Sequence, residues 1–146
     1  TFRAALDELK ARGYAGVIAG DLHLEDVRQW NQERAVAAGL RLLEPLWHHD
    51  GLALLETFVT AGFRAVLTCC DDRWAGTLWP GREIDQAFLR DVSSIERLDA
   101  CGENGEYHSF VFDGPLFLHP VDWSSGEIRR ANGFSQLDLV PASPGP

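Results

Sequence analysis

Segments with helical periodicity alternate with short apolar runs through the first half of the chain, and this alternation constrains the fold more than any other feature. Apolar residues spaced three and four apart predict helices, and apolar runs of a few residues predict buried strands. The expected elements are a helix over residues 2–9, a strand over 14–19, a helix over 24–38, a strand over 40–46, a helix over 52–59 and a strand over 64–70. This order favours right-handed βαβ crossovers and a parallel sheet covered by helices, where ligands bind beyond the carboxyl ends of the strands.

Two aspartates and two glycines mark where these helices are expected to begin and end. Asp21 is expected to cap the helix over 24–38, and Asp50 the next helix, because a short carboxylate accepts the unpaired N–H groups of a first helical turn. Gly39 and Gly62 follow the same two helices and are expected to end them.

The second half of the chain has a different pattern. The periodicity loosens over residues 71–81, recovers as a helix around Ile84, Phe88 and Leu89, and gives way to strand-forming residues from 107 to about 139. The final stretch, 141–146, contains three prolines and is expected to be a frayed tail.

We therefore expect an α/β chain with two domains. Residues 1–48 would hold a partial parallel sheet, and residues 49–146 a small α+β domain.

Composition narrows the classes of function. Lys and Arg total 13 against 22 Asp and Glu, which gives a net charge of −9, and the basic residues are scattered, so no nucleic-acid partner is expected. No run approaches the roughly 18 apolar residues of a membrane helix and no basic leader is present, so we expect no membrane association and a cytoplasmic location. Three cysteines, of which Cys69 and Cys70 are adjacent, are expected to be reduced thiols.

The start of the chain also carries information. It opens at Thr1, contains no methionine and moves directly into a helical pattern with no strand before it. We expect it to be part of a longer protein that supplies the first strands of the sheet.

The loop over residues 102–106, called the glutamate loop below, is the strongest candidate site. Glu103 and Glu106 lie three residues apart, flanked by Gly102 and Gly105, and an alternating strand follows. Glycine permits backbone angles that other residues avoid, so the loop is expected to be tight and to expose its N–H groups to a ligand.

Five motifs together resemble a known family. The strings GVIAGDLHLEDVRQW, PLW, GFRAVL, GREID and CGENGEYHSFVFDGPLF occur in this order and begin at residues 16, 45, 62, 81 and 101. They resemble the diphthine-ammonia ligase family of PP-loop ATP pyrophosphatases over nearly the whole chain. The resemblance implies that residues 1–48 are the end of a Rossmann-like adenine-nucleotide alpha-hydrolase domain and that 49–146 bind the substrate.

The resemblance also implies a reaction and its partners. ATP with Mg²⁺ would adenylate a carboxylate on a small molecule or a protein side chain, and ammonia would then displace AMP. The family's Ser-Gly-Gly-Lys-Asp-Ser phosphate loop is absent from this sequence, so it is expected upstream of Thr1, and the chain alone is not expected to turn over ATP. A homodimer is also kept as an expectation.

Site residues follow from the same resemblance. The expected nucleotide-binding residues are Gly20, Asp21 and Arg28. The expected substrate-binding residues are Arg82, Gly102, Glu103, Asn104, Gly105, Glu106, Tyr107 and His108. No residue is assigned a catalytic role.

The glutamate loop departs from the family pattern, which reads Gly-Glu-Gly-Gly-Glu, an aromatic residue, Glu and Thr. Asn104 stands in place of the middle glycine, and His108 and Ser109 stand in place of Glu and Thr. The acceptor is therefore left open between diphthine and another carboxylate.

Each candidate also has a structural interpretation. Asp21 can serve as a helix cap alone, and Arg28 can be an ion-paired surface residue. Arg82 and Asp85 have the spacing of a local ion pair. Alternation along its strand predicts that His108 shares a face with phenylalanines and is half-buried.

Two other functions remain open. The chain could be a ligand-binding module that kept the acceptor pocket without ATP chemistry. It could also be a metal-dependent hydrolase using His48, His49 and Asp50 with the residues from Cys69 to Asp72, although adjacent ligands cannot easily face one ion and no Cys-x-x-Cys spacing occurs. No metal site is therefore expected.

Overall fold

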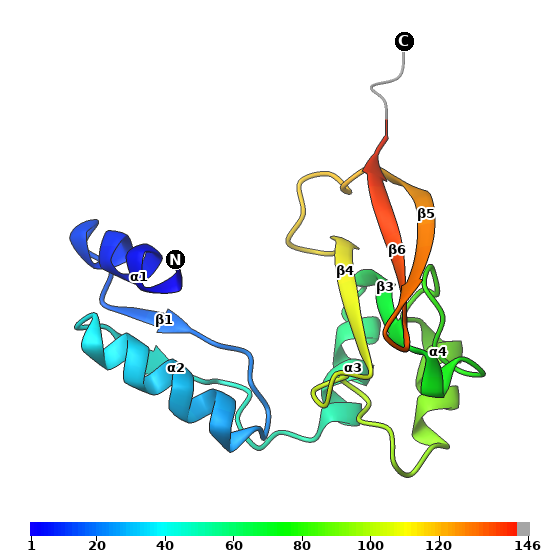
Figure 1. Cartoon of the computed structure of the whole chain (residues 1–146), viewed down its shortest axis with the longest axis horizontal. Helices are drawn as coiled ribbons and strands as arrows, with labels where there is room; N and C mark the ends of the chain where they lie inside the picture. The colour runs from blue at the N-terminus through cyan, green and yellow to red at the C-terminus, as the bar shows by residue number, and fades with distance from the viewer. Residues whose placement is uncertain (143–146) are drawn as a thin grey trace. The chain divides into compact units, whose positions relative to one another are not determined.

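The chain folds into two compact units, Thr1–Asp50 and Gly51–Pro146, in a computed structural model that describes residues 1–142 (Figure 1). Each unit has its own hydrophobic core and its own sheet. The chain is therefore of the mixed α/β class that the sequence predicts.

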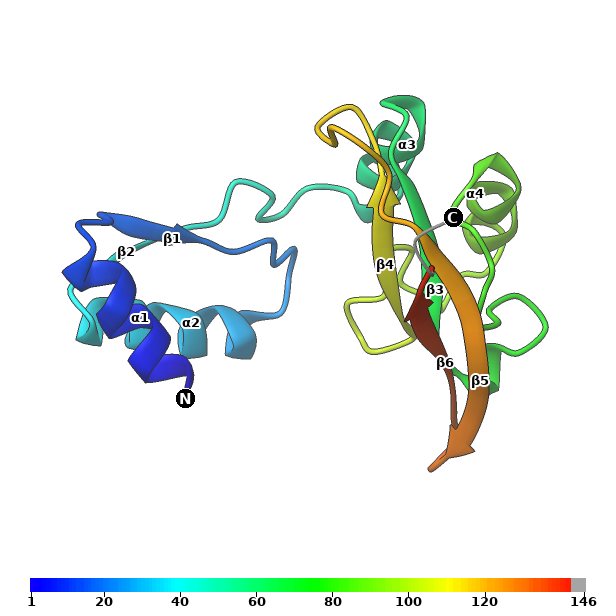
Figure 2. The same cartoon turned by 90° about the horizontal axis from the view of Figure 1, so that it is seen from above.

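The first unit is a short parallel sheet with two helices. Its elements are α1 (Phe2–Ala11), β1 (Gly16–Ile18), α2 (Glu25–Ala37) and β2 (Arg41–Leu43). Strands β1 and β2 pair in parallel, and both helices lie on one side of them (Figure 2). The small core consists of Leu6, Ala35, Ala38 and Leu40, with Leu9, Val17 and Leu42 packed against it. Ile18 and Leu43 pair across the strands and are exposed.

The second unit is an antiparallel sheet with two helices. Its elements are α3 (Gly51–Thr60), β3 (Arg64–Asp71), the 3-10 helix η1 (Asp72–Trp74), α4 (Gln86–Ser93), β4 (Tyr107–Asp113), β5 (Trp123–Ala131) and β6 (Phe134–Pro141). The strand order is β4-β3-β6-β5. Helices α3 and α4 contact each other and supply Leu55, Phe88, Leu89 and Val92 to the core, where they meet Leu67 and Cys70 of β3.

Strand β3 differs from the expectation that helix–strand alternation would continue into one parallel sheet. It pairs antiparallel with β4 and, near its end, with β6. The first part of its other edge is bridged by the extended segment near Glu83. Periodicity predicts that β3 is a buried strand, but strand direction depends on partners more than thirty residues away along the chain.

Three local predictions are also wrong. Asp21 does not cap α2, because the cap position is Leu24 and Asp21 instead accepts a hydrogen bond from the Asn31 side chain at 2.8 Å. The strand expected over 40–46 covers only Arg41–Leu43. The expected frayed tail begins too early, since Pro141 is the last residue of β6; the part of it over 143–146 lies outside the described residues.

A bulge between β3 and β4 lies beside His108. Leu67 pairs with Ser109 and Cys69 pairs with His108, so Thr68 is an extra residue on β3, and its hydroxyl donates to the His108 carbonyl at 3.2 Å. A bulge locally disrupts the ladder between two strands. His108 is exposed and not half-buried as the regular pattern predicts.

Candidate functional site

The glutamate loop precedes β4 and is built around two buried or half-buried carboxylates. Oε1 of Glu106 accepts the Asp99 N–H and Oε2 accepts the Asn104 N–H, both at 3.1 Å. Oδ1 of Asp99 accepts the N–H groups of Cys101 at 2.9 Å and Glu103 at 3.3 Å. Glu106 is only 4% exposed, so these hydrogen bonds form away from solvent. They hold the loop in one shape.

Glycine and tyrosine complete this loop. Gly102 and Gly105 have φ values of 75° and 85°, which β-carbon sterics disfavour for other residues. At Gly102 a side chain would also meet the Tyr107 carbonyl oxygen at 3.0 Å. The Tyr107 hydroxyl donates to the Ala100 carbonyl at 2.6 Å, and burial raises the pKa of this phenol well above its ordinary value.

The loop amides therefore point to internal acceptors. The expected exposure of loop amides to a ligand is wrong for the N–H groups of Cys101, Glu103 and Asn104, which are bonded within the loop. Glu106 is a structural acceptor in this arrangement, whereas Glu103 is half-buried. Assignment of the loop residues to substrate binding stays a prediction.

Asp71 and Arg73 lie beside this loop, at the end of β3 and in η1; the sequence pointed to Asp71 only as a possible metal ligand, and Arg73 was missed. The Asp71 N–H donates to the Glu106 carbonyl at 2.9 Å. The Asp71 carboxylate accepts the Arg73 N–H at 2.9 Å and the Arg73 Nε–H at 2.7 Å, with a further bond from Nη2. This pairing lowers the pKa of Asp71 and raises the pKa of Arg73. An Asp-x-Arg sequence immediately after a buried strand is the signal that could have identified them.

Arg82 is buried in the core side of the second unit. Its guanidinium lies 4.5 Å from the Trp79 ring centre and 5.0 Å from that of Phe88, and it donates to the Thr77 carbonyl and to Asp91. The local ion pair expected between Arg82 and Asp85 is not the one formed. Asp85 is the N-cap of α4, where it accepts the Phe88 N–H at 2.8 Å.

In the first unit, polar side chains gather beyond the ends of β1 and β2. Asp21 and Gly20 follow β1, and Glu44 follows β2. Arg28 Nε donates to Glu44 Oε2 at 2.9 Å, which raises the pKa of Arg28, and the guanidinium lies 4.7 Å from the Trp47 ring centre. A hollow of about 270 Å³ on α2 is lined by Glu25, Arg28, Gln29 and Gln32.

Glu44 is another residue that sequence reasoning did not single out. Its side chain is 9% exposed, and within the described chain its Oε1 is buried with no hydrogen-bond partner. Arg28 is thus paired with the Glu44 carboxylate and lies over the Trp47 ring. These contacts agree with the interpretation of Arg28 as an ion-paired residue. A role for Gly20, Asp21 or Arg28 in nucleotide binding stays a prediction.

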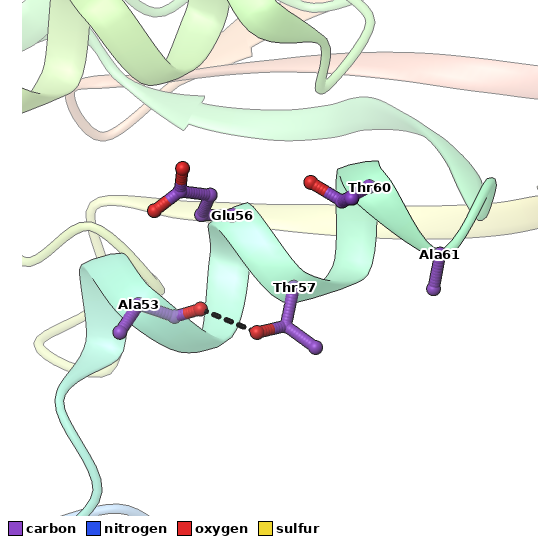
Figure 3. A pocket seen from close by; sticks show the side chains of 5 residues that line it. All are labelled: Ala53, Glu56, Thr57, Thr60 and Ala61. Carbon is purple, nitrogen blue, oxygen red and sulfur yellow. Dashed lines mark hydrogen bonds between the residues drawn. The ribbon is translucent and has the colours of Figure 1, made fainter.

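A larger hollow, of about 520 Å³, lies on α3 and is lined by Ala53, Glu56, Thr57, Thr60 and Ala61 (Figure 3). All five residues come from this helix or the residue after it. The Thr57 hydroxyl donates to the Ala53 carbonyl at 2.8 Å. The surface is one-sided and offers no convergent polar groups, so the loop before β4 remains the better candidate site.

The cysteines and histidines form no metal centre in the part of the chain that the structure describes. No three His, Cys, Asp or Glu side chains of residues 1–142 are grouped to hold an ion. All three cysteines are free thiols, as expected, and burial raises the pKa of Cys70 to about 12. Over the same residues, no helix has the length and apolar character needed to cross a membrane.

The fold and the site together define a class: a chain of two α/β units in which a glutamate loop lies at the end of an antiparallel sheet. The family described as "Diphthamide synthase C-terminal domain" matches residues 50–139, which cover the glutamate loop and most of the second unit. Since this match spans more than half of the chain, the chain belongs to that family, as the sequence motifs implied.

Curated relatives agree with this membership. The chain is similar to diphthine–ammonia ligase of Danio rerio, 33% identical over 135 residues, which cover 86% of this chain and 51% of the relative. It is also similar to the Bos taurus ligase, 28% identical over 67% of this chain and 39% of the relative. The Schizosaccharomyces pombe ligase is 32% identical over 62% of this chain and 16% of the relative. The chain thus spans about half the length, or less, of these relatives.

Proposed function

We propose that this chain is the acceptor-binding part of an ATP-dependent amide ligase. The parent protein would adenylate a carboxylate with ATP, release pyrophosphate, and form the amide when ammonia displaces AMP. The observation that carries the proposal is the preorganised glutamate loop, held by Asp99 and Glu106, within the unit that matches the family. A rigid polar loop positions a substrate at lower entropic cost than a mobile one.

The acceptor class rests on the relatives, whose name gives diphthine as the acceptor and ammonia as the nitrogen donor. We propose a carboxylate acceptor of this kind and leave its identity open, because Asn104 and His108 lie in the loop that would contact it. His108 is exposed on β4, and its backbone pairs with Cys69. Its imidazole is therefore available to contact the acceptor, at a position where the family pattern has a glutamate.

ATP is the proposed cosubstrate, with Mg²⁺. The polar residues beyond β1 and β2 would contact the nucleotide, with Asp21 after β1 and Arg28 on α2 paired to Glu44 after β2, since such ligands bind beyond the strand ends. They do not form a triphosphate site by themselves, since Arg28 is already paired with Glu44, and residues 1–142 contain no grouped carboxylates for Mg²⁺. We therefore assign phosphate and Mg²⁺ binding to the phosphate loop of a longer parent protein.

The test is pyrophosphate release by the full-length parent protein. With ATP, Mg²⁺ and ammonium, we expect release that depends on an added carboxylate acceptor, with diphthine tested first and a panel of small carboxylates next. Hydroxylamine in place of ammonium should yield a hydroxamate, because it attacks the same activated carboxyl group. Release that is independent of every acceptor, or no release at all, would contradict the proposal.

A ligand-binding module without ATP chemistry is the second candidate, and the internally bonded glutamate loop is the observation that supports it. Calorimetric titration of the parent protein with ATP separates the two candidates, since only the ligase should bind it. We also propose a cytoplasmic location, which the three free thiols support.

A further inference from the structure

Arg73 is an exposed guanidinium held in place by a buried carboxylate. The Arg73 side chain is 77% exposed, whereas that of Asp71 is 5% exposed. Asp71 binds the Arg73 backbone N–H as well as the side chain, so η1 begins with both groups fixed. An exposed arginine normally samples many rotamers, and fixing it in advance reduces the entropy lost when it binds an anion.

Backbone contacts place this arginine beside the glutamate loop. Asp71 donates its N–H to the Glu106 carbonyl, and its neighbour Cys70 pairs with Tyr107 across β3 and β4. The start of η1 and the end of the loop therefore lie side by side at one end of the sheet. The Glu106 carboxylate contributes to the raised pKa of Arg73, and it already accepts two backbone N–H groups.

The site needs a cationic donor for a carboxylate ligand. The loop amides of Cys101, Glu103 and Asn104 are bonded within the loop, so they do not supply an anion site. Arg82 is buried and engaged with Asp91 and Thr77. The contacts of Arg73 with Asp71 use Nε and Nη2, so within the described residues Nη1 is available to an incoming carboxylate oxygen.

We propose that Arg73 binds the carboxylate of the acceptor beside the glutamate loop and that Asp71 is the positioning residue that orients it. This inference rests on the proposed function, because amide formation is the reaction that calls for a carboxylate acceptor. The planar guanidinium suits a carboxylate better than a lysine ammonium would.

Acetate is the probe for a first experiment on the whole chain. Titration is followed through the side-chain Nε–H signals of ¹⁵N-labelled arginines, with the Arg73 signal assigned by its loss in Arg73→Lys. We expect a saturable shift of this signal with acetate and none with acetamide. Asp71→Asn should weaken acetate binding by about tenfold, because the guanidinium is no longer fixed.

Arg64 provides the matched control. It lies at the opposite end of β3, its side chain is 52% exposed, and it is paired with Glu83 at 2.8 Å. Its signal should not saturate over the same acetate range. Equal responses of Arg64 and Arg73, or equal responses of Arg73 to acetate and acetamide, would overturn the inference.

A kinetic experiment on the full-length parent protein separates this inference from the proposed function. If the parent forms amide, Arg73→Gln should raise KM for the acceptor by about tenfold, while Arg64→Gln leaves it unchanged. Amide formation with KM unchanged in Arg73→Gln would overturn the role of Arg73 and leave the proposed function standing. Absence of amide formation in the wild-type parent would overturn the proposed function, and the acetate titration would then decide whether Arg73 binds carboxylates.

Discussion

Glu106→Gln should destabilise the second unit, because it changes a buried carboxylate that accepts two backbone N–H groups. Glutamine keeps the shape of the side chain but turns one accepting oxygen into an NH₂ donor. One of the bonds to Asp99 and Asn104 then becomes a contact between two donors, and the other loses its charge. Hydrogen bonds to a charged group contribute about 1.5–3 kcal/mol each, so we expect a loss of about 2–4 kcal/mol.

Urea denaturation and native-state hydrogen exchange measure this effect at two levels. The free energy of unfolding should fall by the stated amount, and the amides of Asp99 and Asn104 should exchange at least about tenfold faster. Glu96→Gln is the matched control, since Glu96 is exposed in the same unit and its change should stay within about 0.5 kcal/mol. Equal stability of the Glu106→Gln and Glu96→Gln variants, with unchanged exchange at Asn104, would refute the structural role of Glu106.

Three further predictions concern acid, base and activity. Arg73 lowers the pKa of Asp71, so this pair stabilises the folded state above the ordinary aspartate pKa of 3.8. The stabilisation is lost as pH falls below that value. In an acid titration of stability, Asp71→Asn should therefore lose less unfolding free energy than the wild type. Burial raises the pKa of Cys70 from 9.0 to about 12, so the free energy of unfolding should fall as pH rises from 9 to 12. Urea denaturation at several pH values should show a smaller fall in Cys70→Ala than in the wild type. In the full-length parent, Glu103→Gln should reduce acceptor-dependent turnover more than Glu96→Gln does, whereas its unfolding free energy should change less than that of Glu106→Gln.

Sequence periodicity predicts the elements of this chain well where burial follows the period. The helices α1, α2, α3 and α4 and the strand β3 all lie where apolar spacing places them. The glycine-flanked loop also occurs where its residue types favour a turn. Local chemistry is enough for this feature because positive φ angles depend on a few neighbouring residues.

Features that depend on distant partners could not be predicted in the same way. Arg82 pairs with Asp91 and not with Asp85, because Asp85 caps α4 and the buried guanidinium lies between two aromatic rings. The bulge at Thr68 depends on how β3 pairs with β4, and no pattern in either strand alone contains that information.

The two glutamates of the loop show the limit most clearly. Their spacing and their flanking glycines look alike in the sequence, which predicts that both bind a ligand. The structure separates them, since Glu106 is buried and accepts loop amides whereas Glu103 is half-buried and lies on the segment that those bonds shape. Backbone N–H groups compensate the charge of the buried Glu106 carboxylate, so this acid stabilises the loop.

Transfer of nitrogen to an acceptor tests the account most directly. The full-length parent protein would be incubated with ATP, Mg²⁺, ¹⁵N-ammonium and a carboxylate acceptor, beginning with diphthine, and the acceptor would be analysed by mass spectrometry. The account predicts ¹⁵N in a new amide, formed in equal amount to the pyrophosphate released, and loss of both in Glu103→Gln. ATP consumption without ¹⁵N incorporation, or incorporation unaffected by Glu103→Gln, would contradict it.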